Sequence, residues 1–185
     1  MIIGVLALQG DYSAHAKCLQ ALGATVQLVR QPEQLDLIAA LIIPGGESSA
    51  FLKLLEHDNF FAKLLSFVHH KPTFGTCAGA ILLARHVENP AQKCLGALDV
   101  SVRRNAYGSQ RQSTIHMGET VLGGNPLEMI FIRAPRIVRI GLDVEVLAKC
   151  GDDPVWIRQG HLMAATFHPE LSIDYRVHAE FLNGL

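Results

Sequence analysis

The most constraining feature of this sequence is a set of short, continuous apolar runs that each end at a turn. Ile2–Leu8 holds only apolar residues and one glycine, and Ala40–Ile43 is entirely apolar and runs into a Pro-Gly-Gly turn. Strands that are buried on both faces of a parallel sheet have this continuous pattern, whereas strands with one solvated face alternate. Both runs therefore indicate strands of a largely parallel, covered sheet.

Segments with helical spacing of apolar residues separate these runs. We expect helices over residues 11–22, 48–57, 59–70, 78–86 and 172–182, and further strands at 25–29 and 73–75. From Leu95 to Phe167 the pattern changes to short β-like runs between glycines, prolines and asparagines. This order predicts an α/β domain in three layers (α/β/α), with a mainly parallel sheet and antiparallel additions.

Length and composition narrow the possible functions. A chain of 185 residues, 49% hydrophobic and 18% charged, is expected to form a single domain over residues 1–185. The net charge of −1 without a large basic cluster argues against nucleic acid and anionic membranes as partners. The apolar N-terminus has no basic region before it, and no run approaches a membrane span, so we expect a cytoplasmic protein.

The cysteines and histidines indicate neither disulfides nor a metal. Four cysteines without a C-x-x-C pair favour reduced thiols. The nine histidines do not fall at the spacings of metal ligands, so we expect no metal.

The stretch Gly-Thr-Cys-Ala-Gly at 75–79 places a thiol between two glycines where a strand gives way to a helix. Gly75 and Gly79 flank Cys77 with the spacing that G-x-S-x-G uses to hold a nucleophile in a tight, exposed turn. At the start of a helix the free N–H groups favour the thiolate, and the N–H of Ala78 can face an oxyanion. The pentapeptide alone leaves open a buried cysteine that only fills a gap.

A base for such a nucleophile is available in His168-Pro169-Glu170, which follows another apolar run. Pro169 biases His168 toward an extended backbone, and Glu170 can hold the imidazole. The alternative is a His-Pro turn with a solvated glutamate. We favour the catalytic interpretation because the cysteine and this histidine would lie at the same carboxyl edge of a parallel sheet. The histidines without such neighbours are interpreted as surface or packing residues: His15, His116, His161 and His178.

The Pro-Gly-Gly-Glu-Ser segment at 44–48 also follows a buried strand. Its glycines allow close approach of the backbone to a ligand, so the N–H of Gly46 can complete an oxyanion hole with that of Ala78. Ser48 is expected to cap the following helix. Capping explains Glu47 less readily, and we expect its carboxylate to recognise a substrate ammonium.

Six short motifs resemble one family in their order and spacing. They are Leu8-Gln9-Gly10, Pro44-Gly45-Gly46-Glu47-Ser48, Gly75-Thr76-Cys77-Ala78-Gly79, Arg104-Asn105-Ala106-Tyr107-Gly108, Phe131-Ile132-Arg133-Ala134-Pro135 and His168-Pro169-Glu170-Leu171. Together they resemble the glutaminase subunit of pyridoxal 5′-phosphate synthase, within the class I glutamine amidotransferases. The resemblance implies a flavodoxin-like fold and hydrolysis of L-glutamine to glutamate and ammonia without a cofactor. It also implies a hetero-oligomer with a separate synthase subunit, which receives the ammonia and builds pyridoxal phosphate from ribose 5-phosphate and glyceraldehyde 3-phosphate.

The same resemblance implies a role for individual residues. Cys77, His168 and Glu170 form the catalytic triad. The residues implied to bind glutamine are Gly46, Glu47, Ser48, Arg104, Ile132 and Arg133. The sequence departs from the family pattern at Ser109, where the family usually has arginine, and Arg111 is the nearby cation.

Two other functions are weighed against this one. A catalytically silent binding or regulatory protein would keep the fold without turnover, but the complete Cys77, His168 and Glu170 set argues against it. Another cysteine hydrolase of similar α/β fold would need neither the H-P-E nor the P-G-G-E-S motif. Release of ammonia from glutamine separates these possibilities.

Overall fold

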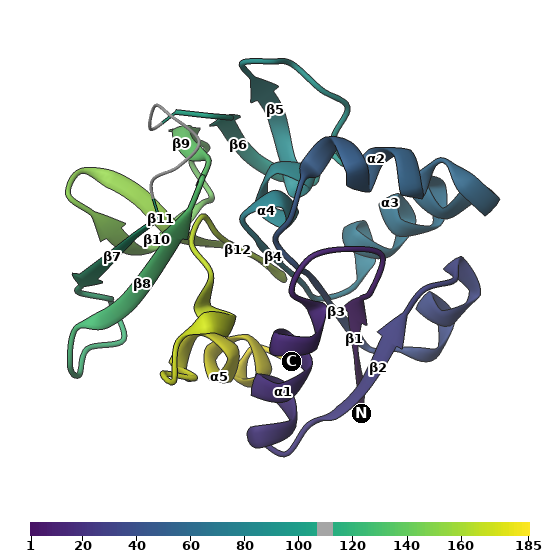
Figure 1. Cartoon of the computed structure of the whole chain (residues 1–185), viewed down its shortest axis with the longest axis horizontal. Helices are drawn as coiled ribbons and strands as arrows, with labels where there is room; N and C mark the ends of the chain where they lie inside the picture. Colours follow the sequence, from purple (N-terminus) through teal and green to yellow (C-terminus); the bar gives the residue numbers. More distant parts are fainter. Residues whose placement is uncertain (107–112) are drawn as a thin grey trace.

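The computed structural model describes residues 1–106 and 113–185 and is built around a seven-stranded sheet (Figure 1). The strand order is β10-β11-β12-β4-β3-β1-β2. Neighbouring strands from β12 to β2 are parallel, whereas β11 is antiparallel to both of its neighbours. The strands are β1 (Ile2–Leu6), β2 (Thr25–Val29), β3 (Ala40–Ile43), β4 (Thr73–Thr76), β10 (Glu145–Cys150), β11 (Asp153–Gln159) and β12 (Leu162–Ala165).

Helices cover both faces of this sheet, which explains the continuous apolar runs. In β3, Leu41 and Ile43 join the hydrophobic cluster under three helices, while Ala40 and Ile42 join the cluster on the opposite face. The first face carries α2 (Ser48–Leu55), α3 (Phe60–His70) and α4 (Ala78–Leu83); the other carries α1 (Tyr12–Ala21) and α5 (Arg176–Asn183) (Figure 1). The predicted three-layer α/β fold with a mixed, mostly parallel sheet is confirmed.

Two smaller sheets flank the central one and differ from the sequence prediction. The three-stranded sheet is formed by β5 (Ala84–Glu88), β6 (Leu98–Arg103) and β9 (Arg136–Ile140), and β7 (Ser113–Gly118) pairs with β8 (Leu127–Ile132). The helix predicted over 78–86 therefore ends at Leu83, because the next residues pair with β6 instead. Strand β7 was not predicted, since its residues face solvent and Ile115 and Met117 are its only large apolar residues.

Short 3₁₀ turns link several elements: Pro32–Leu37, His57–Asn59 and Pro169–Leu171. The C-terminal helix begins at Arg176 and not at residue 172. Asp11 precedes α1, but its side chain makes no capping hydrogen bond, unlike the prediction. Within the two described ranges, no helix is long and apolar enough to cross a membrane.

The sheet order determines which loops meet. Strands β12, β4, β3 and β1 are adjacent and parallel, so their carboxyl ends lie side by side at one edge. The segments that leave these ends carry His168, Cys77, the Gly45-Gly46 turn and Gly10. Ligands of open α/β sheets bind at such carboxyl edges.

Candidate active site

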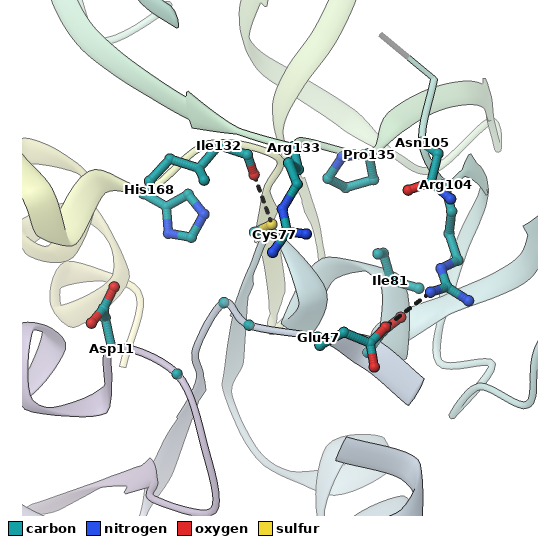
Figure 2. Close-up of a pocket in the computed structure, with 14 residues that line it drawn as sticks. Asp11, Glu47, Cys77, Ile81, Arg104, Asn105, Ile132, Arg133, Pro135 and His168 are labelled. Atoms are coloured by element: carbon teal, nitrogen blue, oxygen red, sulfur yellow. Dashed lines mark hydrogen bonds and ion pairs between the residues drawn. The ribbon is translucent and has the colours of Figure 1, made fainter. Parts of the chain in front are cut away.

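A cavity of about 290 Å³ lies at this carboxyl edge (Figure 2). Its walls come from the ends of four strands of the central sheet and from the loops after β6 and β8. The lining residues are Gly10, Asp11, Gly45, Gly46, Glu47, Ser48, Cys77, Ile81, Arg104, Asn105, Ile132, Arg133, Pro135 and His168. A cavity of this size is suited to one small polar molecule.

Cys77 occupies a strained turn between β4 and α4. Its backbone has φ 46° and ψ −101°, which is uncommon for a residue with a side chain, and its N–H donates to the carbonyl of Ala165 at 2.8 Å. A Cβ atom at Gly79 would collide with the carbonyl of Ile43, and one at Gly75 would lie 2.6 Å from the Gly79 backbone. The two glycines therefore let strand and helix approach closely enough to form this turn. Strain of this kind is typical of active sites.

His168 lies next to the thiol and is held by a buried carboxylate. Its Nδ1 atom is 2.7 Å from Oε1 of Glu170, and both side chains are almost fully buried. The backbone N–H of His168 donates to the carbonyl of Ile130 at 2.8 Å. Burial alone would lower the pKa of His168, but its hydrogen bonds to Cys77 and Glu170 raise the pKa to about 10. The structure thus brings the predicted cysteine, histidine and glutamate together.

Gly45 packs between the two reactive side chains. A Cβ atom built on it would collide with Cε1 of His168, and it would lie 3.1 Å from Nδ1 of that ring and 3.3 Å from Cβ of Cys77. Only a hydrogen atom fits there. The glycine is required because the chain after β3 passes directly in front of the imidazole.

We expect Gly45→Ala to reduce glutaminase activity strongly while the chain stays folded. The methyl group would displace the imidazole, so kcat should lose much of the roughly 10²–10⁴-fold that a placed general base contributes. Steady-state glutamate release measures this loss, and circular dichroism checks the fold. The matched control is Gly184→Ala, whose methyl group would meet only ordinary contacts at 3.6 Å and beyond. Full activity in Gly45→Ala would contradict the placement of His168.

Glu47 has a structural role that the sequence did not reveal. Its carboxylate accepts hydrogen bonds from the N–H of Ala50 at 2.8 Å and from Oγ of Ser49 at 2.9 Å, so Glu47 is the N-cap of α2. The prediction that Ser48 caps this helix was wrong: its hydroxyl donates to Gln92 instead. Burial alone would raise the pKa of Glu47, but these hydrogen bonds lower it. The carboxylate therefore stays charged at the rim of the cavity.

Two arginines bring positive charge to the same cavity. Arg104 forms an ion pair with Glu47, with Nη2 3.0 Å from Oε1 (Figure 2). Among the described residues, no carboxylate pairs with Arg133, which lines the same cavity as Cys77 (Figure 2). Asn105 and Arg133 have positive φ values of 52° and 47°. Both loops are thus bent to face the cavity. Apart from the family motifs, nothing in the sequence indicated that these residues belong to the site.

The structure brings most of the predicted site residues to this one cavity. All six predicted glutamine-binding residues line it, as do Cys77 and His168. Glu170 lies behind His168, and Ala78 lies one residue past the thiol at the start of α4. Ser109 and Arg111 lie outside the described residues.

Some residues were missed or misjudged by the sequence analysis. The cavity-lining Gly10, Asn105 and Pro135 occur in the family motifs but were not assigned a role. His15 and His178, interpreted as surface or packing residues, are completely buried and connect to Glu170. In the two described ranges there is no group of three or more potential metal ligands, and the prediction of a metal-free site remains a prediction.

The chain is similar in sequence to one well-defined group of proteins. Residues 5–185 match the model of the SNO glutamine amidotransferase family. The pyridoxal 5′-phosphate synthase subunit PdxT of Koribacter versatilis (strain Ellin345) is 62% identical over 182 residues, which cover 98% of this chain and 94% of the relative. The subunit of the same name from Solibacter usitatus (strain Ellin6076) is 49% identical over 99% of this chain and 98% of its own.

Solved structures show the same relationship. A crystal structure of a glutamine amidotransferase superposes with a TM-score of 0.92 at 43% identity and covers 100% of this chain and 98% of its own. The structure of PurLQS from Thermotoga maritima has a TM-score of 0.72 at 15% identity, covering 98% of this chain and 97% of its own. The latter supports the fold alone.

Proposed function

Since this chain belongs to the SNO glutamine amidotransferase family, we propose that its cavity is a glutaminase site in which Cys77 is the nucleophile, His168 the acid and base, and Glu170 the residue that orients His168. The chain is the glutaminase subunit of pyridoxal 5′-phosphate synthase and supplies ammonia for the synthesis of that cofactor. Its reaction is the hydrolysis of L-glutamine to L-glutamate and ammonia. The observation that carries the proposed roles is the proximity of the strained Cys77 turn to His168, together with the 2.7 Å contact from His168 to Glu170.

In the first half of the reaction, the sulfur of Cys77 attacks the side-chain amide carbon of glutamine. The carbonyl oxygen becomes an oxyanion, for which Ala78 offers an N–H that has no acceptor within its helix. We assign the N–H of Gly46 as the second donor. His168 then gives its proton to the amide nitrogen, the C–N bond breaks, and ammonia leaves behind a glutamyl thioester.

In the second half, water replaces the sulfur. The now neutral imidazole of His168 takes a proton from water as the oxygen attacks the thioester carbon. The C–S bond breaks, glutamate is released and the thiolate and imidazolium are restored. Throughout, Glu170 accepts from Nδ1 of His168, which leaves Nε2 as the ring atom that exchanges protons.

Recognition of glutamine follows from the charges around the thiol. We propose that Arg133, which has no carboxylate partner among the described residues, binds the α-carboxylate together with Arg104. Glu47 would attract the α-ammonium from its place at the rim, next to Gly46 and Ser48. The loop that follows Ile132 closes the cavity beside Cys77, whose sulfur lies 3.9 Å from the Ile132 carbonyl.

Ammonia must then reach a second active site. We propose that residues 1–185 form one glutaminase domain, because both hydrophobic clusters pack against the same sheet. We propose that the acceptor of ammonia is a separate synthase subunit in a hetero-oligomer, because the PdxT relatives are themselves named as synthase subunits. All four cysteines are unpaired, which supports a cytoplasmic location.

We expect the chain to allow its partner synthase to use glutamine. The two proteins should co-purify when they are produced together. Their mixture should form pyridoxal phosphate from ribose 5-phosphate, glyceraldehyde 3-phosphate and glutamine. Product absorbance measures the rate. An ammonium salt in place of glutamine is the control, because it should support synthesis without this chain. Equal glutamine-dependent synthesis with and without the chain would contradict the proposal.

A further inference from the structure

Two completely buried histidines from different helices meet behind the proposed triad. His15 of α1 has its Nδ1 atom 2.9 Å from Nε2 of His178 in α5. On the other side of its ring, Nε2 lies 3.0 Å from Oγ1 of Thr76 and 3.3 Å from Oε2 of Glu170. The other oxygen of Glu170 contacts His168 at 2.7 Å. His15 thus lies beside the carboxylate oxygen that His168 does not use, and that oxygen has no hydrogen-bond partner among the described residues.

The contacts determine where the protons lie. Nε2 of His15 faces a carboxylate and a hydroxyl oxygen, so it must carry the proton, which it donates to Oγ1 of Thr76. Its Nδ1 is then an acceptor, and Nε2 of His178 donates to it. This assignment leaves Nδ1 of His178 as an unprotonated nitrogen, and that atom is buried without a hydrogen-bond partner among the described residues. The buried atom that lacks a partner is therefore an acceptor nitrogen, Nδ1 of His178. No N–H group of the two rings is left without an acceptor.

Both histidines of this pair are neutral at pH 7. Burial lowers the pKa of His15, and burial is also the main reason that the pKa of His178 falls to about 3. For Glu170, burial alone would raise the pKa, but the hydrogen bond from His168 and the positive charge of His168 outweigh burial and lower the pKa. The carboxylate therefore remains charged although its side chain is fully buried.

We propose that His15 is a positioning residue of the glutaminase reaction: fixed by His178 and Thr76, it places its Nε2–H 3.3 Å from the far oxygen of Glu170, which has no hydrogen-bond partner among the described residues, and this polar edge keeps the carboxylate turned toward His168. The proposal rests on the roles proposed above for His168 and Glu170. A buried carboxylate that loses a polar N–H group beside it is stabilised in its neutral form. It would then no longer accept from Nδ1 of His168 as a charged partner.

Titratable groups face Glu170 from three parts of the chain. His15 and Cys18 face it from α1, and the thiol of Cys18 contacts its backbone carbonyl at 3.8 Å. His168 faces it from its own segment, and His178 acts from α5 through His15. Asp11, before α1, acts on His15 by its charge. Among these groups, His15 and His168 are the two that contact the carboxylate oxygens.

The test compares His15→Leu, which removes the donor, with His15→Gln, whose amide can replace the Nε2–H. In His15→Leu, the acidic limb of the kcat/KM profile should move up by about one pH unit or more, the scale on which a lost partner shifts a carboxyl pKa. At pH 7, kcat should fall about 10- to 100-fold, part of the roughly 10²–10⁴-fold that the base contributes. KM should stay constant, because His15 does not line the cavity. His15→Gln should restore most of kcat, and its acidic limb should lie at the same pH as that of the wild type.

The control is His161→Leu, which removes a histidine bound to the carbonyl of Val68 and outside the cavity lining. An unchanged acidic limb in folded His15→Leu, or no recovery in His15→Gln, would overturn the proposal. If His15→Leu does not fold, His178→Leu is measured instead and should shift the limb in the same direction. The proton resonance of Nδ1–H in His168 gives a readout without turnover. It should weaken or move upfield in the variant even if glutamine is not the substrate.

Discussion

Replacing Cys77 by alanine is expected to abolish glutamate release. The sulfur forms the bond to the substrate, and among the described residues no other thiol lines the cavity. Loss of the nucleophile of a triad enzyme costs about 10⁶-fold in kcat, so the variant should fall to the background of the assay. Coupled detection of glutamate with glutamate dehydrogenase provides the measurement.

The same variant should remain folded, which makes the result interpretable. The side chain is small, and removing one buried atom costs about 1 kcal/mol of the free energy of unfolding. Cys94→Ala is the matched control, because its sulfur contacts the carbonyl of Arg85 outside the cavity, and it should keep full activity. Wild-type activity in Cys77→Ala would end the proposed mechanism.

The central fold and the reactive pair could be predicted because both depend on local sequence. Alternate residues of β3 pack into opposite hydrophobic clusters, so the strand is apolar throughout and recognisable. The glycines around Cys77 are required where β4, the turn and α4 approach one another and β3 closely. His168 and Cys77 then meet because their strands, β12 and β4, are neighbours. The expectation of a parallel sheet was enough to predict that Cys77 and His168 lie at the same carboxyl edge.

Other features depend on contacts between distant segments and left no local signal. Arg104 contacts Glu47 across 57 positions of the chain, and the cap by Glu47 replaces the expected cap by Ser48. The helix after Cys77 is shortened because Ala84–Glu88 pairs with β6, although its residues allow either structure. Family motifs pointed to Arg104 and Arg133, but they did not indicate the ion pair.

The buried histidines show the same limit most clearly. His15 and His178 are 163 positions apart, and each stands alone in an ordinary amphipathic helix. Only the packing of α1 and α5 on one face of the sheet brings them to Glu170. A histidine in a helix is therefore not informative until its partners in space are known.

His168 is expected to act first as an acid, since its raised pKa keeps the imidazole charged at neutral pH. A group with a raised pKa is protonated until the pH passes that value. The basic limb of the kcat/KM profile should therefore lie near the pKa of about 10, far above the ordinary histidine value of 6.5. Glu170→Gln removes the negative partner of His168 and should therefore move this basic limb to lower pH.

The His168→Asn variant is expected to lower kcat by roughly 10²–10⁴-fold, the contribution of general acid and base catalysis, because neither departing ammonia nor attacking water would have a proton partner. Steady-state glutamate release should show the loss with little change in KM, since the cavity keeps its charged walls. His70→Asn, at the exposed end of α3, is the control and should be unaffected. Glu170→Gln should be milder, because the imidazole remains and only its orientation and charge suffer. A larger loss in Glu170→Gln than in His168→Asn would mean that the carboxylate, and not the imidazole, handles the proton.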